Sequence, residues 1–285
     1  HLDFHADMET YFDAKASLFS PDRVRTAVIN IDDAHGRKLA GQTELPKILV
    51  GLDPDADMVI SGIQGDVDGT RFTLTGDDVA LEIAVPLMGN FNVSNAAIAA
   101  TIALALGTPA EAVVRGLAAV GPIRGRMEPV SHDGGFTVLV DYAHTPDAIS
   151  EVLQAGRTSA TGRVIAVIGA AGDRDRDKRA LMGAAAVRFA DVTIITSDNP
   201  RTEDPGVIAE EVKRGADAVP GSTARVIVDR RDAIFHAVKQ ARSGDIVLIL
   251  GKGHEQGIEI HGETHPFDDR LVAAEALTSR GLQPR

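Results

Sequence analysis

The chain has 285 residues, which is long for one compact core and suits two domains, since domains usually run to about 100–200 residues. Hydrophobic residues make up 44% of the chain and charged residues 25%, so it is expected to fold as a globular protein without low-complexity tails. The net charge of −12 argues against a general nucleic-acid surface, and the lack of cysteine excludes disulfides, a thiol nucleophile and a thiolate metal site, which fits a cytoplasmic protein.

The first third of the chain predicts mixed secondary structure. Residues 7–19 have apolar positions spaced by three and four, which indicates a helix with Asp7 as a plausible cap. Strand-like runs follow at residues 27–31, 58–63, 71–74 and 79–85, and helices are predicted at residues 93–106 and 109–119. The longest apolar run, residues 96–106, is far shorter than the ~20 residues that cross a bilayer, so a buried helix and no membrane insertion are expected.

The character of the sequence changes after residues 121–126, which have the composition of a connection. We therefore place a domain boundary between residues 1–124 and 125–285. Continuous apolar strands are predicted at residues 137–140, 164–168, 192–195, 225–228 and 246–250, with helices between them. Such runs are typical of a parallel sheet covered on both faces, so the second half is predicted to be a Rossmann-like α/β domain.

Polar segments follow four of these predicted strands, at residues 141–144, 169–174, 198–201 and 251–255. Taken singly, each segment is equally well explained as a turn or a helix cap. Ligands of open parallel sheets bind beyond the carboxyl ends of the strands, and four polar segments at one such edge indicate a binding site.

The motifs of the chain resemble those of the Mur ligase family over essentially its whole length. The resemblance rests on His1-Leu2-Asp3 with Lys15 fourteen positions later, on the segment 89–95, and on Asp198-Asn199-Pro200-Arg201. It implies an α/β fold in which residues 1–124 are the carboxyl-terminal part of a central ATPase-type domain. Residues 125–285 are then the Rossmann-like carboxyl-terminal domain, which binds the incoming amino acid.

In this family the lysine is carbamylated and the histidine helps to hold magnesium, which assigns Mg²⁺ to His1 and to Lys15 as its carbamate. The residues suit that chemistry, because Lys15 is predicted on the apolar face of its helix, where a neutral amine can capture carbon dioxide and a carbamate is a hard oxygen ligand. A snorkelling lysine is the alternative. The family's catalytic set would be Lys15, His1 and Arg126.

The resemblance also implies an ATP site. It places Asn95 at the adenine, Arg126 at the phosphates and Asp141 at the ribose, with His144 facing the nucleotide. Three of these residues have simpler alternatives: Asn95 could cap a helix, Arg126 could be a solvated linker residue, and His144 lies in a turn before a proline.

Six residues are assigned by resemblance to the amino acid: Arg174, Asp198, Asn199, Arg201, Gly251 and Glu255. A meso-diaminopimelate has two carboxylates and two amines, so it needs guanidinium groups and an acceptor for ammonium. Lysine has no distal carboxylate for Arg201, and leaving a desolvated arginine unpaired would cost several kcal/mol, while each ~1.4 kcal/mol is a factor of ten.

The sequence departs from the family at three places. Ala171 stands where a glycine is usual, and a glutamine is often found near Ile258. No phosphate-binding Gly-x-x-x-x-Gly-Lys-[Ser/Thr] motif occurs, and residues 251–254 lack its first glycine and its hydroxyl residue. We therefore expect that a preceding segment with this motif is missing and that the chain alone does not complete the reaction.

The implied activity is ATP-dependent addition of meso-diaminopimelate to UDP-N-acetylmuramoyl-L-alanyl-D-glutamate through an acyl phosphate, in a monomer whose partners are these small molecules. Alternatives within the ligase class are a lysine-adding relative and a folylpolyglutamate synthetase, and Arg201 disfavours both. A dinucleotide-dependent oxidoreductase lacks support, because no Gly-x-Gly-x-x-Gly follows the first predicted parallel strand. A non-catalytic binding module remains the alternative from another class.

Overall fold

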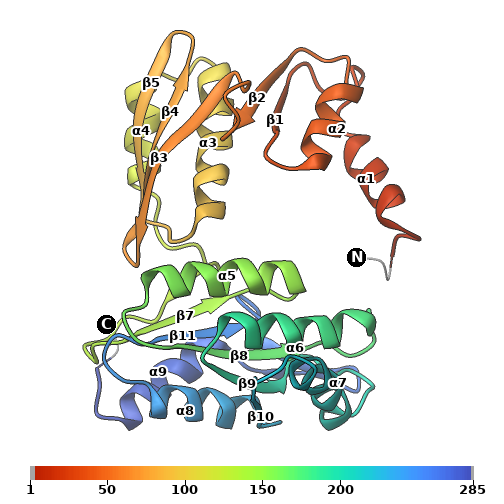
Figure 1. Cartoon of the computed structure of the whole chain (residues 1–285), viewed down its shortest axis with the longest axis vertical. Coiled ribbons are helices and arrows are strands. Elements are labelled where there is room, and N and C mark those ends of the chain that lie inside the picture. The colour runs from red at the N-terminus through yellow and green to blue at the C-terminus, as the bar shows by residue number, and fades with distance from the viewer. Residues whose placement is uncertain (1–3, 284–285) are drawn as a thin grey trace. The chain divides into compact units, whose positions relative to one another are not determined.

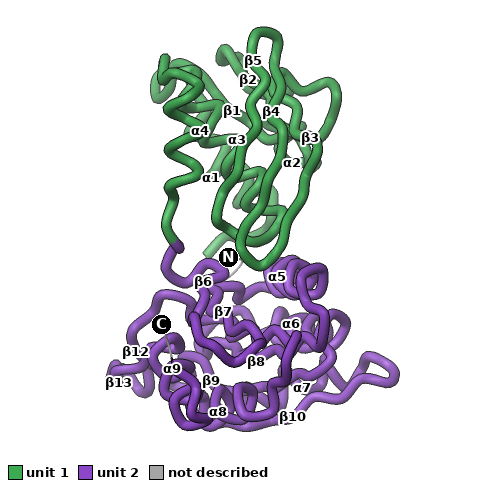
Figure 2. Tube along the Cα trace, turned by 90° about the vertical axis from the view of Figure 1, so that its left-hand side faces the viewer, with its two compact units in different colours: residues 1–121 green, residues 122–285 purple. Residues whose placement is uncertain are grey.

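The computed structural model describes residues 4–283 and divides into two compact units, one up to Gly121 and one from Pro122 (Figure 2). The predicted boundary lies three residues further along the chain. Each unit has its own sheet and its own hydrophobic core, so each is described by itself.

Unit 1 is built on one five-stranded sheet with the order β1-β2-β3-β4-β5 (Figure 1). Its first three strands are parallel and its last three antiparallel. Its elements are α1 (Met8–Ala16), β1 (Ala27–Asn30), α2 (Ala34–Gln42), β2 (Lys47–Gly51), β3 (Met58–Asp66), β4 (Gly69–Gly76), β5 (Val79–Val85), α3 (Asn90–Ala105) and α4 (Ala110–Ala118).

Helix α3 covers the sheet of unit 1 with one face only. Small and branched side chains of this face are buried with β3, β4 and β5, among them Val93, Ala97 and Ala100. Ile102 and Leu106 are 44% and 81% exposed, so the expectation of a wholly buried helix over residues 96–106 is wrong. No helix in the described residues 4–283 is long and apolar enough to span a membrane.

Helix α1 begins as predicted, because the Asp7 carboxylate accepts a hydrogen bond from the Thr10 backbone N–H at 2.7 Å and caps it. It ends at Ala16, three residues before the predicted end, and turns follow. Helix α2 and strand β2 were not predicted, since α2 buries only Ala40 and its sequence has little apolar periodicity.

Unit 2 has a six-stranded sheet in the order β10-β9-β8-β11-β7-β6, in which all strands but the edge strand β6 are parallel. Its elements are β6 (Glu128–Pro129), β7 (Thr137–Asp141), α5 (Pro146–Ser159), β8 (Val164–Ala170), α6 (Asp177–Phe189), β9 (Val192–Ser197), α7 (Pro205–Asp217), β10 (Ala224–Val226), α8 (Arg230–Gln240), β11 (Ile246–Leu250), β12 (Gly257–Ile260), β13 (Glu263–Pro266) and α9 (Asp269–Ser279). The five predicted parallel strands and the Rossmann-like α/β layout are confirmed.

The direction of the crossovers explains the layers of unit 2. From β7 through β8 and β9 to β10 the chain steps one way across the sheet, and right-handed connections place α5, α6 and α7 on one face. The step from β10 to β11 reverses, so α8 lies on the opposite face beside α9 (Figure 1). Every residue of β8 and β11 is buried as a result, which explains their uninterrupted apolar sequences.

Candidate functional site

The polar segments that follow β7, β8, β9 and β11 meet at the carboxyl edge of the unit 2 sheet, as the sequence predicts. Direct backbone hydrogen bonds join them: the Gly172 N–H donates to the Asn199 carbonyl at 2.8 Å, and the Gly251 N–H donates to the Asp141 carbonyl at 3.1 Å. We call this edge, formed by residues 141–144, 171–174, 198–201 and 251–255, the rim.

A hydrogen-bonded network of three side chains lies at the centre of the rim. The Asn199 Nδ2 donates to Glu255 Oε2 at 2.8 Å, and the Lys252 Nζ donates to the same Glu255 oxygen at 2.8 Å and to Asn199 Oδ1 at 2.9 Å. Asn199 Oδ1 also accepts the Glu259 backbone N–H at 3.0 Å, which fixes the orientation of the amide. Glu255 Oε1 accepts no hydrogen bond from the part of the chain that the structure describes.

The charges around this network are shielded from water. Asp198 is 6% exposed, and burial raises the pKa of its carboxyl even though Arg230 and Lys252 oppose the shift. Burial acts on Glu255 in the same direction, but the hydrogen bonds from Lys252 and Asn199 outweigh it, and the pKa of Glu255 is lowered. Arg230 in turn forms a fully buried bidentate pair with Asp269, at 2.7 and 2.6 Å.

Arg201 is held by the β12–β13 hairpin. Its backbone is in the left-handed region, with φ of 52°, which is uncommon for a residue with a side chain. Its N–H donates to the Glu259 carbonyl at 3.0 Å, and its own carbonyl accepts the His261 N–H at 2.8 Å. These two bonds, one to β12 and one to the turn after it, fix the position from which the guanidinium projects.

The Arg201 guanidinium already has an anionic partner. Its Nε donates to Glu259 Oε2 at 2.9 Å and its Nη1 to the Gly172 carbonyl at 2.6 Å. The assumption that lysine would leave Arg201 unpaired is therefore wrong, because Glu259 neutralises the arginine when no substrate carboxylate is present. Arg201 therefore keeps an ionic partner within unit 2 itself and is not an isolated buried arginine.

The loop after β8 is shaped by Gly172 rather than by the residue before it. A Cβ on Gly172 would lie 1.9 Å from the Pro200 carbonyl oxygen, so no side chain fits there. Ala171 is tolerated, and its carbonyl accepts Arg179 Nη2 at 3.1 Å. The predicted ligand Arg174 is exposed on this loop, and its charge acts on Tyr142, which places it beside the rim.

The predicted nucleotide residues of unit 2 surround Tyr142. The Arg126 guanidinium lies 5.3 Å from the centre of its ring, and His144 Nδ1 is 2.8 Å from its carbonyl oxygen. Burial and the nearby carboxylates of Glu255 and Asp198 raise the pKa of the Tyr142 phenol. Tyr142 therefore connects the residues assigned to ATP with those assigned to the amino acid.

Asp141 fastens the chain around it. One carboxylate oxygen accepts the Met127 N–H at 2.8 Å and the other accepts the Ala143 N–H at 2.7 Å. The side chain is 3% exposed, and burial raises its pKa. What the structure shows directly is thus a carboxylate that fixes the segment bearing Arg126 at the end of β7; its predicted contact with ribose stays a prediction.

The remaining predicted residues belong to unit 1. Helix α1 has no buried residue, Lys15 is exposed, and its Nζ lies 5.7 Å from the Tyr11 ring centre, so the prediction that Lys15 lies on a desolvated apolar face is wrong. Asn95 lies inside α3, five residues after its start, and is not its cap. His1 lies outside the described residues.

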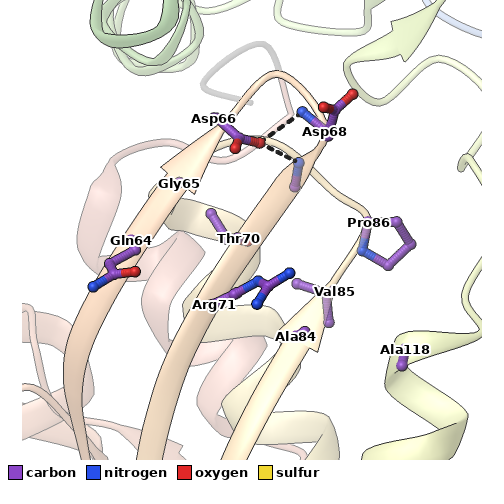
Figure 3. A pocket seen from close by; sticks show the side chains of 11 residues that line it. Gln64, Gly65, Asp66, Asp68, Thr70, Arg71, Ala84, Val85, Pro86 and Ala118 are labelled. Atoms are coloured by element: carbon purple, nitrogen blue, oxygen red, sulfur yellow. Dashed lines mark hydrogen bonds between the residues drawn. The ribbon is translucent and has the colours of Figure 1, made fainter.

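A hollow of about 570 Å³ lies over the ends of β3, β4 and β5 in unit 1 (Figure 3). None of the predicted site residues lines it. Its Asp66 carboxylate accepts the backbone N–H groups of Asp68 and Gly69 at 2.9 and 3.2 Å, so this acid shapes the β3–β4 turn. The chemistry of the rim, rather than this hollow, defines the candidate site.

Two family models match the chain, one for each unit. Residues 1–103 match the Mur ligase middle domain, and residues 125–253 match the Mur ligase, glutamate ligase domain. The chain belongs to the Mur ligase family. The second match covers all four segments of the rim up to Gly253.

Curated relatives extend this Mur ligase assignment. A protein of Streptomyces coelicolor named UDP-N-acetylmuramoyl-L-alanyl-D-glutamate–2,6-diaminopimelate ligase is 44% identical over 283 residues, covering 97% of this chain and 56% of the relative. A protein of Gloeobacter violaceus with the same name is 45% identical over 283 residues, covering 98% of this chain and 57% of the relative. The chain thus spans a little over half the length of these relatives.

Solved structures agree with the fold of this Mur ligase chain. A UDP-N-acetylmuramoyl-L-alanyl-D-glutamate–2,6-diaminopimelate ligase superimposes with a TM-score of 0.64 at 39% identity, covering 99% of this chain and 58% of that one. A folylpolyglutamate synthase of Mycobacterium tuberculosis has a TM-score of 0.68 at 22% identity, covering 99% of this chain and 61% of that one, and shares the fold alone.

Two residues of the site, Lys252 on the rim and Glu259 on β12, were not predicted from the sequence. Lys252 was weighed only as a failed phosphate-loop lysine, although a lysine between two glycines directly after a buried strand is a signal for a tightly packed position. Glu259 lies on a hairpin that was not predicted, and no local pattern connects it with Arg201, 58 positions away.

Proposed function

We propose that this chain belongs to an enzyme that joins meso-diaminopimelate to UDP-N-acetylmuramoyl-L-alanyl-D-glutamate with hydrolysis of ATP to ADP and phosphate. The observation that supports this most is the joining of Asn199, Arg201 and Glu255 at one rim by direct hydrogen bonds and the Glu259 hairpin. The names of the relatives at 44–45% identity point to the same amino acid and the same nucleotide dipeptide.

The rim offers complementary groups for both ends of a diamino diacid. Glu255 Oε1 and the Gly251 carbonyl would accept an ammonium, while Arg174 and Arg201 would bind carboxylates. Because Arg201 is paired with Glu259, the distal carboxylate would have to take the place of Glu259 or share the guanidinium with it. Asp198 and Asn199 would complete this pocket.

The proposed reaction has two steps. The side-chain carboxylate of the glutamyl residue attacks the γ-phosphorus of ATP, the bond from this phosphorus to the bridging oxygen of ADP breaks, and ADP leaves with the electron pair as the acyl phosphate forms. A neutral amine of diaminopimelate then attacks the acyl carbon, phosphate leaves with the electron pair of the C–O bond, and the amine loses one proton. Both steps depend on positioning and on charge stabilisation more than on covalent help from the protein.

The residues around Tyr142 are assigned to ATP in this proposal. Arg126 would neutralise phosphate charge, His144 would face the nucleotide, and Asp141 would act through the segment that it fixes. Asn95 on α3 of unit 1 would meet the adenine. These roles follow the family resemblance, and the exposure of Arg126 and Asn95 leaves both side chains accessible to a ligand.

Residues 4–283 do not provide a complete set of ligands for magnesium. These residues contain no group of three or more histidine, cysteine or acidic side chains that could hold a metal ion, and the exposed Lys15 lacks the buried surroundings that would favour a carbamate. We therefore assign no step of the reaction to a metal bound by the described residues, and carbamylation of Lys15 stays a proposal from resemblance.

The proposal is tested with the full-length protein, ATP and UDP-N-acetylmuramoyl-L-alanyl-D-glutamate, supplying either meso-diaminopimelate or lysine. Phosphate release and the mass of the product are measured. We expect a product heavier by one diaminopimelate residue, formed at least about tenfold more efficiently than the lysine adduct. Equal use of lysine, or phosphate release without a new amide product, would contradict the proposal.

A further inference from the structure

Lys252 is among the most completely buried side chains of the molecule, with 0% exposure, although it bears a charge. A buried ammonium is costly unless it is paired and hydrogen-bonded. Lys252 satisfies this condition through Asn199 Oδ1 at 2.9 Å and Glu255 Oε2 at 2.8 Å. Its complete burial also means that it does not contact a ligand directly, which excludes the role of a phosphate-loop lysine.

The local backbone explains how the lysine reaches both partners. Gly251 has φ of 115° and Gly253 has φ of 52°, and the Glu255 N–H donates to the Lys252 carbonyl at 3.0 Å. A Cβ at Gly253 would lie 2.7 Å from the Tyr142 Cβ, so the turn packs tightly against the segment after β7. The turn therefore folds Lys252 inward and brings Glu255 back over it.

Lys252 bonds to only one of the two carboxylate oxygens of Glu255. Oε2 accepts both Lys252 and Asn199, whereas Oε1 accepts nothing from the described chain. The side chain of Glu255 is 32% exposed, so a ligand can reach it. One oxygen thus belongs to the internal network, and the other keeps its capacity to accept a hydrogen bond from a ligand.

Several charged groups interact with Glu255 in this part of the rim. Lys252 and Arg230 act on both Glu255 and Asp198, Asp269 acts on Asp198, and Arg126 and Arg174 act on the nearby Tyr142. The preference for an ammonium therefore rests on Glu255 Oε1, which accepts no hydrogen bond from the described chain, and not on a net charge. Lys252 lies 3.9 Å from Asp198 and 2.8 Å from Glu255, and so acts on both acids of the rim.

We infer that Lys252 is a positioning residue that holds the Glu255 carboxylate through Oε2, so that Oε1 receives an ammonium group of the incoming amino acid. This inference rests on the proposed function, since it assigns the ligand of Glu255 to the amino acid. Lys252 acts through Glu255 and Asn199 and does not touch the substrate.

The test uses the full-length protein with Lys252→Met, which has a similar length but no charge. We expect the KM for meso-diaminopimelate to rise at least about tenfold, because Glu255 loses the bond that holds it, with the KM for ATP within about twofold of wild type. Without the cation, Asp198 and Glu255 bind protons more readily. The acid limb of the pH profile of kcat/KM for diaminopimelate, where activity falls as the pH falls, therefore moves to higher pH.

The matched control is Arg163→Met, which breaks another ion pair of the same unit. Arg163 pairs with the buried Asp245 at 2.7 Å, where β8 and β11 begin, at the opposite edge of the sheet. This variant loses stability without moving the KM for diaminopimelate or the acid limb. A shift of equal size in both variants would overturn the inference, because it would reflect general destabilisation.

Lys252→Gln covers the case in which Lys252→Met does not fold, because it retains a hydrogen-bond donor and also lacks the charge. It should show the same movement of the acid limb. Loss of the folded protein in both variants would overturn the inference, since Lys252 would then serve the fold rather than the position of Glu255. If the wild-type protein does not use diaminopimelate, the proposed function fails. If the wild-type protein uses diaminopimelate and both Lys252 variants have its KM and pH profile, this inference alone fails.

Discussion

Only glycine fits at position 172, because the chain after β9 occupies the space where a side chain would lie. The expected Cβ would be 1.9 Å from the Pro200 carbonyl oxygen, and the Gly172 N–H donates to the Asn199 carbonyl. This contact sets the spacing between the loop that bears Arg174 and the segment that bears Asn199 and Arg201. The family's usual glycine at the neighbouring Ala171 is therefore not the one on which the rim depends.

Gly172→Ala should lower the free energy of unfolding by about 1–3 kcal/mol, because the two loops must separate to admit a methyl group. The KM for diaminopimelate should rise in parallel as Asn199 moves. Ala171→Gly is the control, and it should change stability by less than about 1 kcal/mol. Thermal or denaturant unfolding with wild-type stability in Gly172→Ala would show that the loops are not in contact in solution.

At the scale of elements, the β12–β13 hairpin determines how Arg201 is presented. The hairpin fixes the Arg201 backbone by two main-chain hydrogen bonds, while the Glu259 side chain, 41% exposed, neutralises its guanidinium. The two functions are separable, because only the second needs the carboxylate. In the proposed complex, a substrate carboxylate and Glu259 would compete for the same arginine.

Glu259→Gln should lower the KM for meso-diaminopimelate by about two- to fivefold, the range expected for a partly exposed ion pair. The KM for lysine should not fall, since lysine has no distal carboxylate to take the freed position. Glu263→Gln, an exposed acid on the same hairpin, is the matched control. A higher KM for diaminopimelate in Glu259→Gln would mean that the carboxylate orients Arg201 instead of competing for it.

Helices α6 and α7 are joined by a second charged cluster. Arg179 on α6 is fully buried and bonds to Glu203 at 2.7 and 2.8 Å and to Glu211 at 2.7 Å. The hydrogen bond from Arg179 is the main reason that the pKa of Glu203 falls from its ordinary 4.5 to about 2. An acid whose pKa is lower in the folded than in the unfolded protein stabilises the fold at pH values above its unfolded-state pKa. This stabilisation is lost as the pH falls through the folded-state pKa.

Glu203→Gln should therefore be less stable than wild type by about 1–2 kcal/mol at pH 7, a figure reduced for the 21% exposure of the Glu203 side chain. The difference should shrink between pH 4.5 and about 2, where wild type protonates Glu203 as well. Urea unfolding over this range measures it, with the exposed Glu210→Gln as control. A difference that does not depend on pH would exclude the ionic explanation.

At the scale of the whole molecule, the sequence predicted the elements with strong periodicity and the shared edge of the parallel sheet. Buried strands such as β8 and β11 are uninterrupted apolar runs, and parallel topology then brings their ends together. It did not predict the pairing of Arg201 with Glu259 or of Lys252 with Asn199, because these contacts join residues 58 and 53 positions apart. Nor did it predict the exposure of Lys15, since the periodicity of α1 does not show what covers the helix.

Binding of the distal carboxylate of diaminopimelate by Arg201 is tested most directly by one comparison. The ratio of kcat/KM for meso-diaminopimelate to that for lysine is measured for the full-length wild type, for Arg201→Ala and for Arg214→Ala, whose arginine on α7 is 73% exposed. The ratio should fall at least about tenfold in Arg201→Ala, mainly through the KM for diaminopimelate, and stay unchanged in Arg214→Ala. Equal losses for both amino acids in Arg201→Ala would contradict the claim.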